Sequence, residues 1–409
     1  MIVEHRDKSS LAGVPGFYQP GALAERESQY FFHTYKRLAL EIDRGEGVYL
    51  VGKDGTRYLD FFGGLAVNSL GYNQARVNEA IKQQVDKYIH LSNFFLQEPQ
   101  VKLAEKLIGV TGYRRVFFSN SGTEAIEGAL KLARKWAKGS QRRMFYGLSN
   151  AFHGRTMGAL SLMDKAKYRD DYAPFVPNFG SLEFNNVDQL RATVNEQTLA
   201  IFLECIQGEG GIFVASHDFV QELNKLREKF GFLIIADEIQ SGIGRTGKFF
   251  GFEHLGLRPD IVVLAKALGG GLPLGAILGG DRVAESFTPG VHGTTFGGNP
   301  VACAAGVVVL EEIVDRGLMK HAAEVGEFMK SEARKLQSEL PQKISDVRGY
   351  GCMIGIELSE PGQPVADELQ KRGILVNCTH ETVLRLLPPL IIQREHCDIF
   401  FRELRSILS

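Results

Sequence analysis

The spacing of hydrophobic residues changes several times along the chain and predicts its secondary structure. The runs 232–236 and 261–265 are apolar throughout, as in strands that are buried on both faces. The segments 123–137 and 219–230 carry apolar residues at three- and four-residue steps, which is typical of amphipathic helices. Such strands and helices alternate from about residue 75 to 290. We therefore expect repeated βαβ units that build a largely parallel sheet.

The two ends of the chain follow other patterns. Weak periodicity and several turn formers in the first 30 or so residues predict an arm that lies on the body or on a partner subunit. Apolar segments on either side of Gly52-Lys53-Asp54-Gly55 predict a small antiparallel unit over 46–62. A long apolar helix is expected at 300–314, and a mixed α/β stretch follows at 320–409.

These patterns predict an α/β protein with a large and a small domain. The length of 409 residues allows two domains, or one large domain with a satellite. We expect an N-terminal arm and part of the small domain over 1–74, a large domain over 75–305, and the C-terminal small domain over 306–409.

Composition excludes several function classes. The chain is 44% hydrophobic and 23% charged, with a formal net charge of −1, so it lacks the basic field that nucleic-acid binding requires. Its apolar runs are shorter than the roughly 18–20 residues that cross a bilayer, so we expect no membrane association. The charged N-terminus does not resemble a secretory or transit signal, and we expect a cytoplasmic protein. Five dispersed cysteines predict reduced thiols, without disulfides or a metal site.

Two charged residues stand at the ends of predicted buried strands, where open parallel sheets bind ligands. Asp237 follows the run 232–236, and a carboxylate there is costly unless it is paired or used. It could hold the protonated nitrogen of a pyridine ring, although a helix cap would also explain it. Lys266 follows 261–265, where desolvation lowers the pKa of an amine and makes it a nucleophile able to form an imine. A lysine that reaches back to the surface is the alternative, and the glycines at 269–271 leave room for a flat ring.

Two further segments could bind an anion. Ser119-Asn120-Ser121-Gly122-Thr123-Glu124 combines small residues with the start of a predicted helix, as a cofactor phosphate requires. A simple cap by Ser121 or Thr123 is the alternative. The glycine-rich loop from His292 to Pro300 offers hydroxyls and free amides, but such clusters are often only turns.

In this order the motifs resemble the class III (ω-amino) pyridoxal-phosphate aminotransferases. The resemblance runs from about residue 30 to the C-terminus, and the pattern of Asp237, Glu238, Gln240 and Lys266 is highly specific. The matching segments are Ser121-Gly122-Thr123-Glu124-Ala125, Phe152-His153-Gly154-Arg155-Thr156, Glu204 through Gly211, Asp237-Glu238-Ile239-Gln240-Ser241-Gly242, Lys266 and Thr294-Thr295. Within the class the chain looks most like the acetylornithine aminotransferases, to which 62–68, 152–161, 376–378 and 384–390 point.

The resemblance implies fold type I (aspartate aminotransferase-like), with a seven-stranded, mostly parallel sheet and a small domain built from both chain ends. It also implies a homodimer with shared active sites and pyridoxal 5′-phosphate as cofactor. Lys266 is then the Schiff-base lysine and proton shuttle, and Asp237 the partner of the pyridine nitrogen. The other cofactor-binding residues would be Ser121, Gly122, Thr123, Phe152, Ile239, Gln240 and, from the neighbouring subunit, Thr295.

Four residues are implied as substrate-binding: Arg155, Glu209, Thr294 and Arg385. Arg155 would bind the distal carboxylate of either substrate and Arg385 the α-carboxylate of glutamate. Glu209 would pair with Arg385 when the amino donor has no carboxylate there, because a guanidinium cannot lose its proton. Two positions depart from the family pattern: Cys205 replaces a proline, and Thr294 replaces a serine but keeps the hydroxyl.

We therefore expect transfer of the δ-amino group of N2-acetylornithine to 2-oxoglutarate, which gives N-acetylglutamate 5-semialdehyde and glutamate in arginine biosynthesis. Other amino donors remain open: ornithine, succinylornithine, acylated lysine or 4-aminobutyrate. Isomerases, decarboxylases and epimerases share the fold, but the three residues Arg155, Glu209 and Arg385 favour a transaminase. A non-catalytic binding protein would have no reason to keep a buried lysine and carboxylate. His153 is interpreted as structural.

Overall fold

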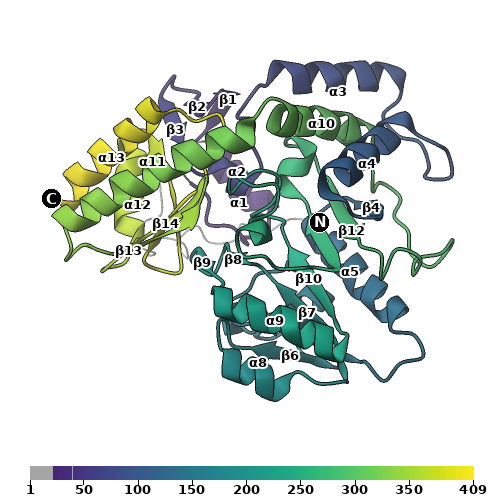
Figure 1. Cartoon of the computed structure of the whole chain (residues 1–409). Coiled ribbons are helices and arrows are strands. Elements are labelled where there is room, and N and C mark those ends of the chain that lie inside the picture. Colours follow the sequence, from purple (N-terminus) through teal and green to yellow (C-terminus); the bar gives the residue numbers. More distant parts are fainter. Residues whose placement is uncertain (1–21, 39) are drawn as a thin grey trace, which may run out of the picture.

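The computed structural model describes residues 22–38 and 40–409. The predicted arm falls mostly on residues 1–21, which lie outside the described residues. The first described element is the helix α1 (Ala22–Tyr30). Figure 1 shows one large body around a twisted sheet and, beside it, a layer formed by the C-terminal helices and strands.

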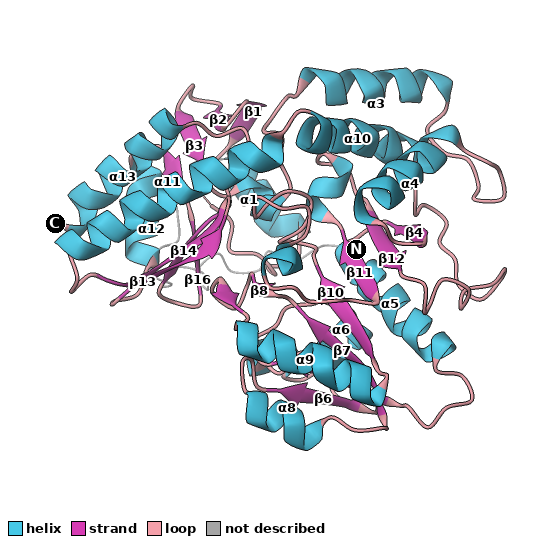
Figure 2. Cartoon of the chain, viewed as in Figure 1, coloured by secondary structure: helices cyan, strands magenta, loops and turns pink. Residues whose placement is uncertain are grey.

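The described part of the chain contains a seven-stranded sheet, and the predicted α/β fold is confirmed. Only its second strand runs antiparallel to its neighbours, so the sheet is mostly parallel. In order across the sheet the strands are β4 (Arg115–Ser119), β12 (Gly275–Gly279), β11 (Ile261–Leu264), β10 (Leu233–Asp237), β7 (Thr198–Leu203), β5 (Met144–Leu148) and β6 (Phe179–Leu182). Figure 2 shows this sheet as the central layer, with helices on either side.

The apolar runs of the sequence form the middle of the sheet. β7, β10, β11 and β12 are buried at every position, as expected of strands that are covered on both faces. The sequence pattern did not predict β6, and it did not predict β12. Its residues, Gly-Ala-Ile-Leu-Gly, form a short run flanked by glycines, and only its place between β4 and β11 makes it a strand.

The predicted helices cover this sheet. α5 (Gly122–Trp136) and α9 (His217–Phe230) bury their apolar faces and agree with prediction to within two residues at each end. The apolar helix expected over 300–314 is α10 (Pro300–Leu310), which continues into a π-helical turn, Glu311–Asp315. The other helices of this body are α3 (Ala75–Lys87), α4 (Glu98–Thr111), α6 (Met157–Ser161), α7 (Ala166–Arg169) and α8 (Val187–Thr193).

Both ends of the described chain contribute to one small sheet. β2 (Tyr49–Gly52) and β3 (Arg57–Asp60) form the antiparallel unit that the sequence predicts. β1 (Ile42–Glu46), which was not predicted, pairs with β2, and β15 (Ile374–Leu375) pairs with β3. A second sheet has the order β13 (Ile344–Tyr350), β14 (Met353–Leu358), β17 (Val383–Leu386) and β16 (Asn377–Thr379). The predicted mixed stretch at 320–409 also contains three helices, α11 (Leu318–Glu339), α12 (Gln363–Lys371) and α13 (Arg394–Leu408).

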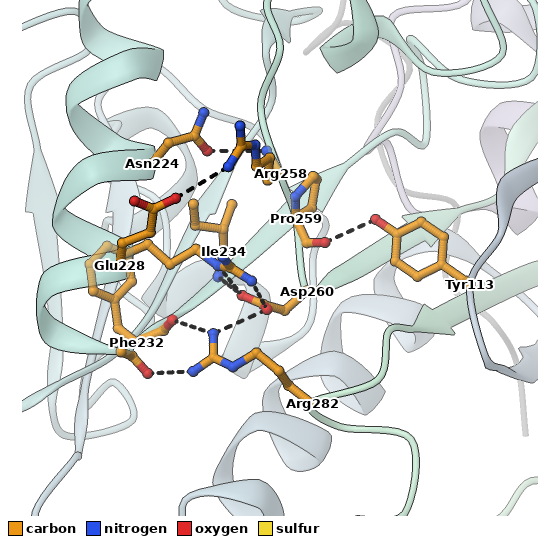
Figure 3. A network of polar contacts seen from close by, with 11 residues as sticks. Tyr113, Asn224, Glu228, Phe232, Ile234, Arg258, Pro259, Asp260 and Arg282 are labelled. Carbon is orange, nitrogen blue, oxygen red and sulfur yellow. Dashed lines mark hydrogen bonds and ion pairs between the residues drawn. The ribbon is translucent and has the colours of Figure 1, made fainter.

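A buried carboxylate stabilises the amino-terminal edge of the large sheet. Asp260, 3% exposed, accepts hydrogen bonds from Nε of Arg227 and the amide of Ile234, both at 2.9 Å, and forms an ion pair with Arg282 at 3.1 Å. Figure 3 shows Asp260 and Arg282 inside a wider polar network that reaches Tyr113. Asp260 precedes β11 and therefore lies at the edge opposite to Asp237 and Lys266, the charged residues beyond its other end.

None of the described helices is long and apolar enough to cross a membrane.

Candidate active site

The two strand-end residues singled out by sequence lie side by side. β10 and β11 are parallel neighbours in which Asp237 is in register with Val263, so Lys266 follows three residues beyond that position. Both residues therefore stand at the carboxyl edge of the sheet, where open α/β sheets bind ligands. Asp237 is 4% exposed, and its carboxylate is almost fully enclosed.

Lys266 adopts an unusual backbone conformation. Its φ is +45°, in a region that side-chain-bearing residues rarely adopt, and the preceding Ala265 has φ −163° and ψ −137°. Such strain persists where the surrounding structure holds it, and it is concentrated at functional sites. Burial lowers the pKa of Lys266 to about 8, against the opposing charges of nearby carboxylates, among them Glu209. The amine is therefore a better nucleophile near neutral pH than an exposed lysine.

The glycines that follow Lys266 are required by the backbone itself. Gly270 and Gly271 have φ values of +59° and +105°. A Cβ on Gly270 would lie 3.0 Å from Val309 and 3.3 Å from Val77, so this glycine also permits close packing of α3 and α10. The expectation that these glycines leave room for a ring stays a prediction.

His153 is the partner of Asp237. Its Nδ1 lies 2.7 Å from Oδ2 of Asp237, while Oδ1 accepts a hydrogen bond from the amide of Ile239 at 3.0 Å. Burial opposes protonation of His153, but the hydrogen bond and the charges of Asp237 and Glu204 raise its pKa above the ordinary value. The sequence interpretation of His153 as merely structural misses this contact. Its position beside Phe152, in a motif quoted for the family, is the signal that could have found it.

Glu204 joins two loops of the site. Its two carboxylate oxygens accept hydrogen bonds from the amides of Phe152, at 2.8 Å, and Gly208, at 3.0 Å. Burial, with the charge of Asp237 added, raises the pKa of Glu204 above its usual range. The loop that carries Phe152 and the turn that leads to Glu209 are thereby fixed to each other.

The predicted anion loop forms the start of α5. Ser121 is the N-cap of this helix, and its hydroxyl accepts a hydrogen bond from the amide of Glu124 at 3.3 Å. The hydroxyl of Thr123 lies 3.0 Å from that of Thr156. A Cβ on Gly122 would lie 2.7 Å from Ile239, so the first turn of α5 lies against the loop that follows Asp237. The cap and the anion site are compatible, because the first-turn amides and the helix dipole remain available.

Arg385 and Glu209 form an ion pair. The pair joins Nη1 of Arg385 to Oε1 of Glu209 at 2.6 Å, and the side chain of Arg385 is only 1% exposed. Asn377 Oδ1 accepts from Nε and Nη2 of Arg385, at 3.1 and 2.5 Å, and Gln240 Oε1 accepts from Nη1 at 3.4 Å. Burial opposes ionisation of Glu209, but Arg385 outweighs it and, with Lys266 nearby, lowers the pKa of this carboxyl.

Asn377 is a partner of Arg385 that the sequence reasoning did not assign. It stands opposite Arg385 in the antiparallel pair of β16 and β17, so the register of that sheet aims its amide oxygen at the guanidinium. The segment 376–378 was noted only as a family resemblance.

Arg155 lies on an aromatic surface and is exposed. Its guanidinium carbon is 4.3 Å from the ring centroid of Tyr168 and 5.4 Å from that of Phe152. Contacts of this kind orient a cation while leaving its N–H groups free to bind a carboxylate. Tyr168 is therefore a second residue that the sequence reasoning missed.

Thr294 and Thr295 differ in their surroundings. The hydroxyl of Thr294 accepts hydrogen bonds from Nδ2 of Asn120 and from the amide of Gly297, both at 3.2 Å, which fixes this loop beside the start of α5. Thr295 is exposed. Within one chain, Thr294 thus closes the loop, and Thr295 faces outward.

The fold and this edge-of-sheet site define a fold type I transferase of the aspartate aminotransferase-like kind. The chain belongs to the class-III aminotransferase family, described as Aminotransferase class-III, whose pattern matches residues 30–408.

Similar proteins support this assignment. An acetylornithine aminotransferase of Aquifex aeolicus is 44% identical over 382 residues, covering 93% of this chain and 100% of that protein. The solved structure of an acetylornithine aminotransferase from Elizabethkingia anophelis is 32% identical, with a TM-score of 0.85 and coverage of 94% and 98% of the two chains. An ornithine aminotransferase from Toxoplasma gondii, with PLP at partial occupancy in its active site, is 30% identical, with a TM-score of 0.89 and coverage of 94% and 93%.

Proposed function

We propose that this class-III aminotransferase moves the δ-amino group of N2-acetylornithine to 2-oxoglutarate with pyridoxal 5′-phosphate as cofactor. The products are N-acetylglutamate 5-semialdehyde and glutamate, a step of arginine biosynthesis, which we place in the cytoplasm. The sequence relationship to acetylornithine aminotransferases, at 38–44% identity, supports this donor.

The residues at the carboxyl edge fit the cofactor. Asp237 offers a buried carboxylate to a protonated pyridine nitrogen, and Lys266 offers an amine of lowered pKa, about 8, to an aldehyde. The first turn of α5, with Gly122 and Thr123, offers amides and a hydroxyl to a phosphate. When bound, pyridoxal phosphate supplies the aldehyde that takes up the amino group and a ring that withdraws electrons.

The remaining residues would orient cofactor and substrate. Lys266, two residues beyond the end of β11, would carry the proton between the amino-bearing carbon of the substrate and the aldehyde carbon of the cofactor. Phe152 and Ile239 would contact the ring, Ser121 would contribute to the phosphate site, and Gln240 would lie near the ring's phenolic oxygen. Gln240 already accepts a hydrogen bond from Arg385, so it connects the cofactor and substrate positions.

The observation that carries the proposal is the ion pair between Glu209 and Arg385. An enclosed guanidinium suits the α-carboxylate of glutamate, but it would be unpaired when an ω-amine donor occupies the site. Glu209, whose side chain is 24% exposed, can pair with Arg385 in that case and move aside for glutamate. Arg155 would bind the distal carboxylate of either substrate, and Thr294 would line the substrate site.

We also propose a homodimer in which the partner subunit's Thr295 reaches the phosphate. Near Thr295 lies an exposed apolar surface formed by Phe94 (98% exposed), Leu96 (98%), Ile89 (61%) and Phe296 (59%). Its two loops are held together, since Nδ2 of Asn93 donates to the carbonyls of Thr294 and Gly297, both at 3.1 Å. Large apolar side chains left exposed on two joined loops favour a subunit interface.

A panel of amino donors tests the proposal. N-acetylornithine, ornithine, succinylornithine, acylated lysine and 4-aminobutyrate are each reacted with 2-oxoglutarate, with Lys266→Ala as the control that should abolish turnover. The proposal predicts a yellow protein that bleaches with the amine donor and prefers N-acetylornithine. A preference for free ornithine would contradict the donor, and turnover without 2-oxoglutarate would contradict transamination. Light scattering in solution tests the dimer.

A further inference from the structure

Glu209 lies in a hairpin that extends from the large sheet to the C-terminal sheet. The hairpin strands are β8 (Ile206–Gln207) and β9 (Phe213–Val214), paired antiparallel, with Glu209 in the turn between them. In sequence the hairpin connects β7 to α9, both parts of the large body. The turn itself, however, contacts residues of the sheet that carries Arg385.

Arg348 on β13 holds the far side of this turn. Its Nε donates a hydrogen bond to the carbonyl of Gly211 at 2.9 Å, and its guanidinium carbon lies 3.9 Å from the ring centroid of Phe213. The same guanidinium pairs with Glu357 and, at 2.8 Å, with Asp346. The side chain of Arg348 is 10% exposed, so its orientation is fixed by these neighbours.

Ile212 adds a strained contact to the same junction. It has φ +59°, a conformation that is a genuine outlier for a β-branched residue, and it is fully buried. Its side chain fills a notch above two glycines: a Cβ on either Gly349 or Gly355 would lie 3.1 Å from it. Such a conformation persists only when its surroundings hold it, so the hairpin is firmly seated on β13 and β14.

Glu209 is anchored through its own backbone as well. Its carbonyl accepts hydrogen bonds from Oγ1 of Thr379, at 3.1 Å, and Nζ of Lys165, at 3.5 Å. Thr379 is on β16, the strand paired with β17, which carries Arg385. Both members of the ion pair therefore rest on one sheet, and the backbone of Glu209 is held from both sides of the turn.

We propose that Arg348 is a positioning residue for substrate selection, which holds the Glu209 hairpin on the sheet of Arg385 so that the ion pair opens by rotation of the Glu209 side chain alone. This inference rests on the proposed exchange between an ω-amine and glutamate. It adds that the fit of Glu209 to Arg385, and hence the balance between the two substrates, is set by a residue on a different strand.

Loosening the hairpin should weaken the use of the amine donor and strengthen the binding of the carboxylate substrate. With Glu209 less well placed, Arg385 is left partly unpaired when an amine donor is bound, which is costly for an enclosed charge. A carboxylate that competes with Glu209 for Arg385 then binds more tightly. If Arg348 had a purely structural role, its loss would instead lower kcat/KM for both substrates together.

The experiment uses the full-length holoenzyme with Arg348→Met, which keeps an apolar stem but loses the donor to Gly211. Thr379→Val removes a different donor to the same hairpin, in case Arg348→Met does not fold. Asp346→Asn is the matched control, because it removes a half-exposed partner of Arg348 and leaves the bond to Gly211 in place. Arg348→Lys, which can still donate, should recover part of the effect.

Two readouts are compared: single-turnover kcat/KM with N-acetylornithine and with glutamate, and the Kd of glutarate by calorimetry. We expect the ratio of kcat/KM for N-acetylornithine to kcat/KM for glutamate to fall on the order of tenfold in Arg348→Met. Thr379→Val should lower the same ratio. Glutarate should bind several-fold more tightly to Arg348→Met than to the wild type, and the ratio in Asp346→Asn should stay within about twofold of the wild-type ratio.

The inference and the proposed function fail in different ways. The role of Arg348 is overturned if the ratio of the two kcat/KM values is unchanged in Arg348→Met. It is also overturned if both kcat/KM values fall in parallel while the affinity for glutarate is unchanged. If the wild-type enzyme does not accept N-acetylornithine, the proposed donor is wrong, and glutarate binding alone then decides the role of Arg348. If the wild type binds no glutarate, Arg385 is not a carboxylate receptor and the inference is overturned as well.

Discussion

Nδ1 of His153 lies 2.7 Å from Oδ2 of Asp237, and the two residues are 1% and 4% exposed. A buried carboxylate of this kind needs a charged or hydrogen-bonding partner, and the imidazole supplies it from the loop that also carries Phe152. The contact connects the cofactor-binding carboxylate that we propose with the part of the chain that would cover the ring. It makes His153 the support of Asp237.

Removing His153 should therefore destabilise the protein. We expect His153→Ala to lower the free energy of unfolding of the cofactor-free protein by about 3 kcal/mol, because it leaves the carboxylate of Asp237 buried without its partner. His153→Asn, which keeps a donor near the position of Nδ1, should lose less. Urea unfolding measures both.

The pH dependence of this effect has a definite sign. The pKa of His153 is raised in the folded protein, so its contribution is fully present below its unfolded pKa of 6.5 and is lost as the pH rises through the folded pKa. The stability difference between wild type and His153→Ala should therefore be largest below pH 6.5 and shrink at higher pH. A difference that grows with pH would contradict the pairing.

The amine of Lys266 should become reactive near pH 8. Burial lowers its pKa to about 8, and only the neutral amine attacks an aldehyde. The rate at which the cofactor-free protein takes up pyridoxal phosphate should rise about tenfold per pH unit below pH 8 and level off above it. Stopped-flow absorbance measures this rate. A rise that continues to pH 10 would indicate an amine with the ordinary pKa.

Replacing Arg385 by lysine should selectively weaken the binding of 2-oxoglutarate. A lysine cannot reproduce the planar guanidinium, which contacts Glu209 and Asn377 at once. We expect the KM for 2-oxoglutarate to rise by about tenfold or more, corresponding to the loss of one charged hydrogen bond of roughly 1.5–3 kcal/mol. The affinity for pyridoxal phosphate should stay near the wild-type value. An equal loss of affinity for 2-oxoglutarate and for pyridoxal phosphate would point to misfolding.

Asp260→Asn should affect stability without affecting the site. Asp260 pairs with Arg227 and Arg282 at the opposite edge of the sheet, and removing its charge leaves two partly buried guanidinium groups without a counter-ion. We expect the free energy of unfolding to fall by about 3–5 kcal/mol, as for other broken buried pairs. Thermal unfolding and kcat of the surviving enzyme provide the measurement, and an unchanged melting temperature would contradict it.

Much of the fold could be predicted because, in many elements, the local hydrophobic pattern agrees with the burial of the residues. β10 and β11 are apolar runs, and α5 and α9 have clear helical spacing and serine caps. β12 could not be predicted in this way. Its five residues carry no helical or alternating pattern, and its strand conformation depends on partners that lie far away in the sequence.

The sequence by itself singled out Lys266 and Asp237 as candidate site residues, since a lysine and a carboxylate at the ends of apolar strands are too costly without a use. Tertiary structure alone decided their partners. His153 reaches Asp237 across 84 positions, Glu209 reaches Arg385 across 176, and Arg348 reaches Gly211 across 137. No local pattern specifies contacts over such separations, because they depend on how strands of separate sheets are placed against one another.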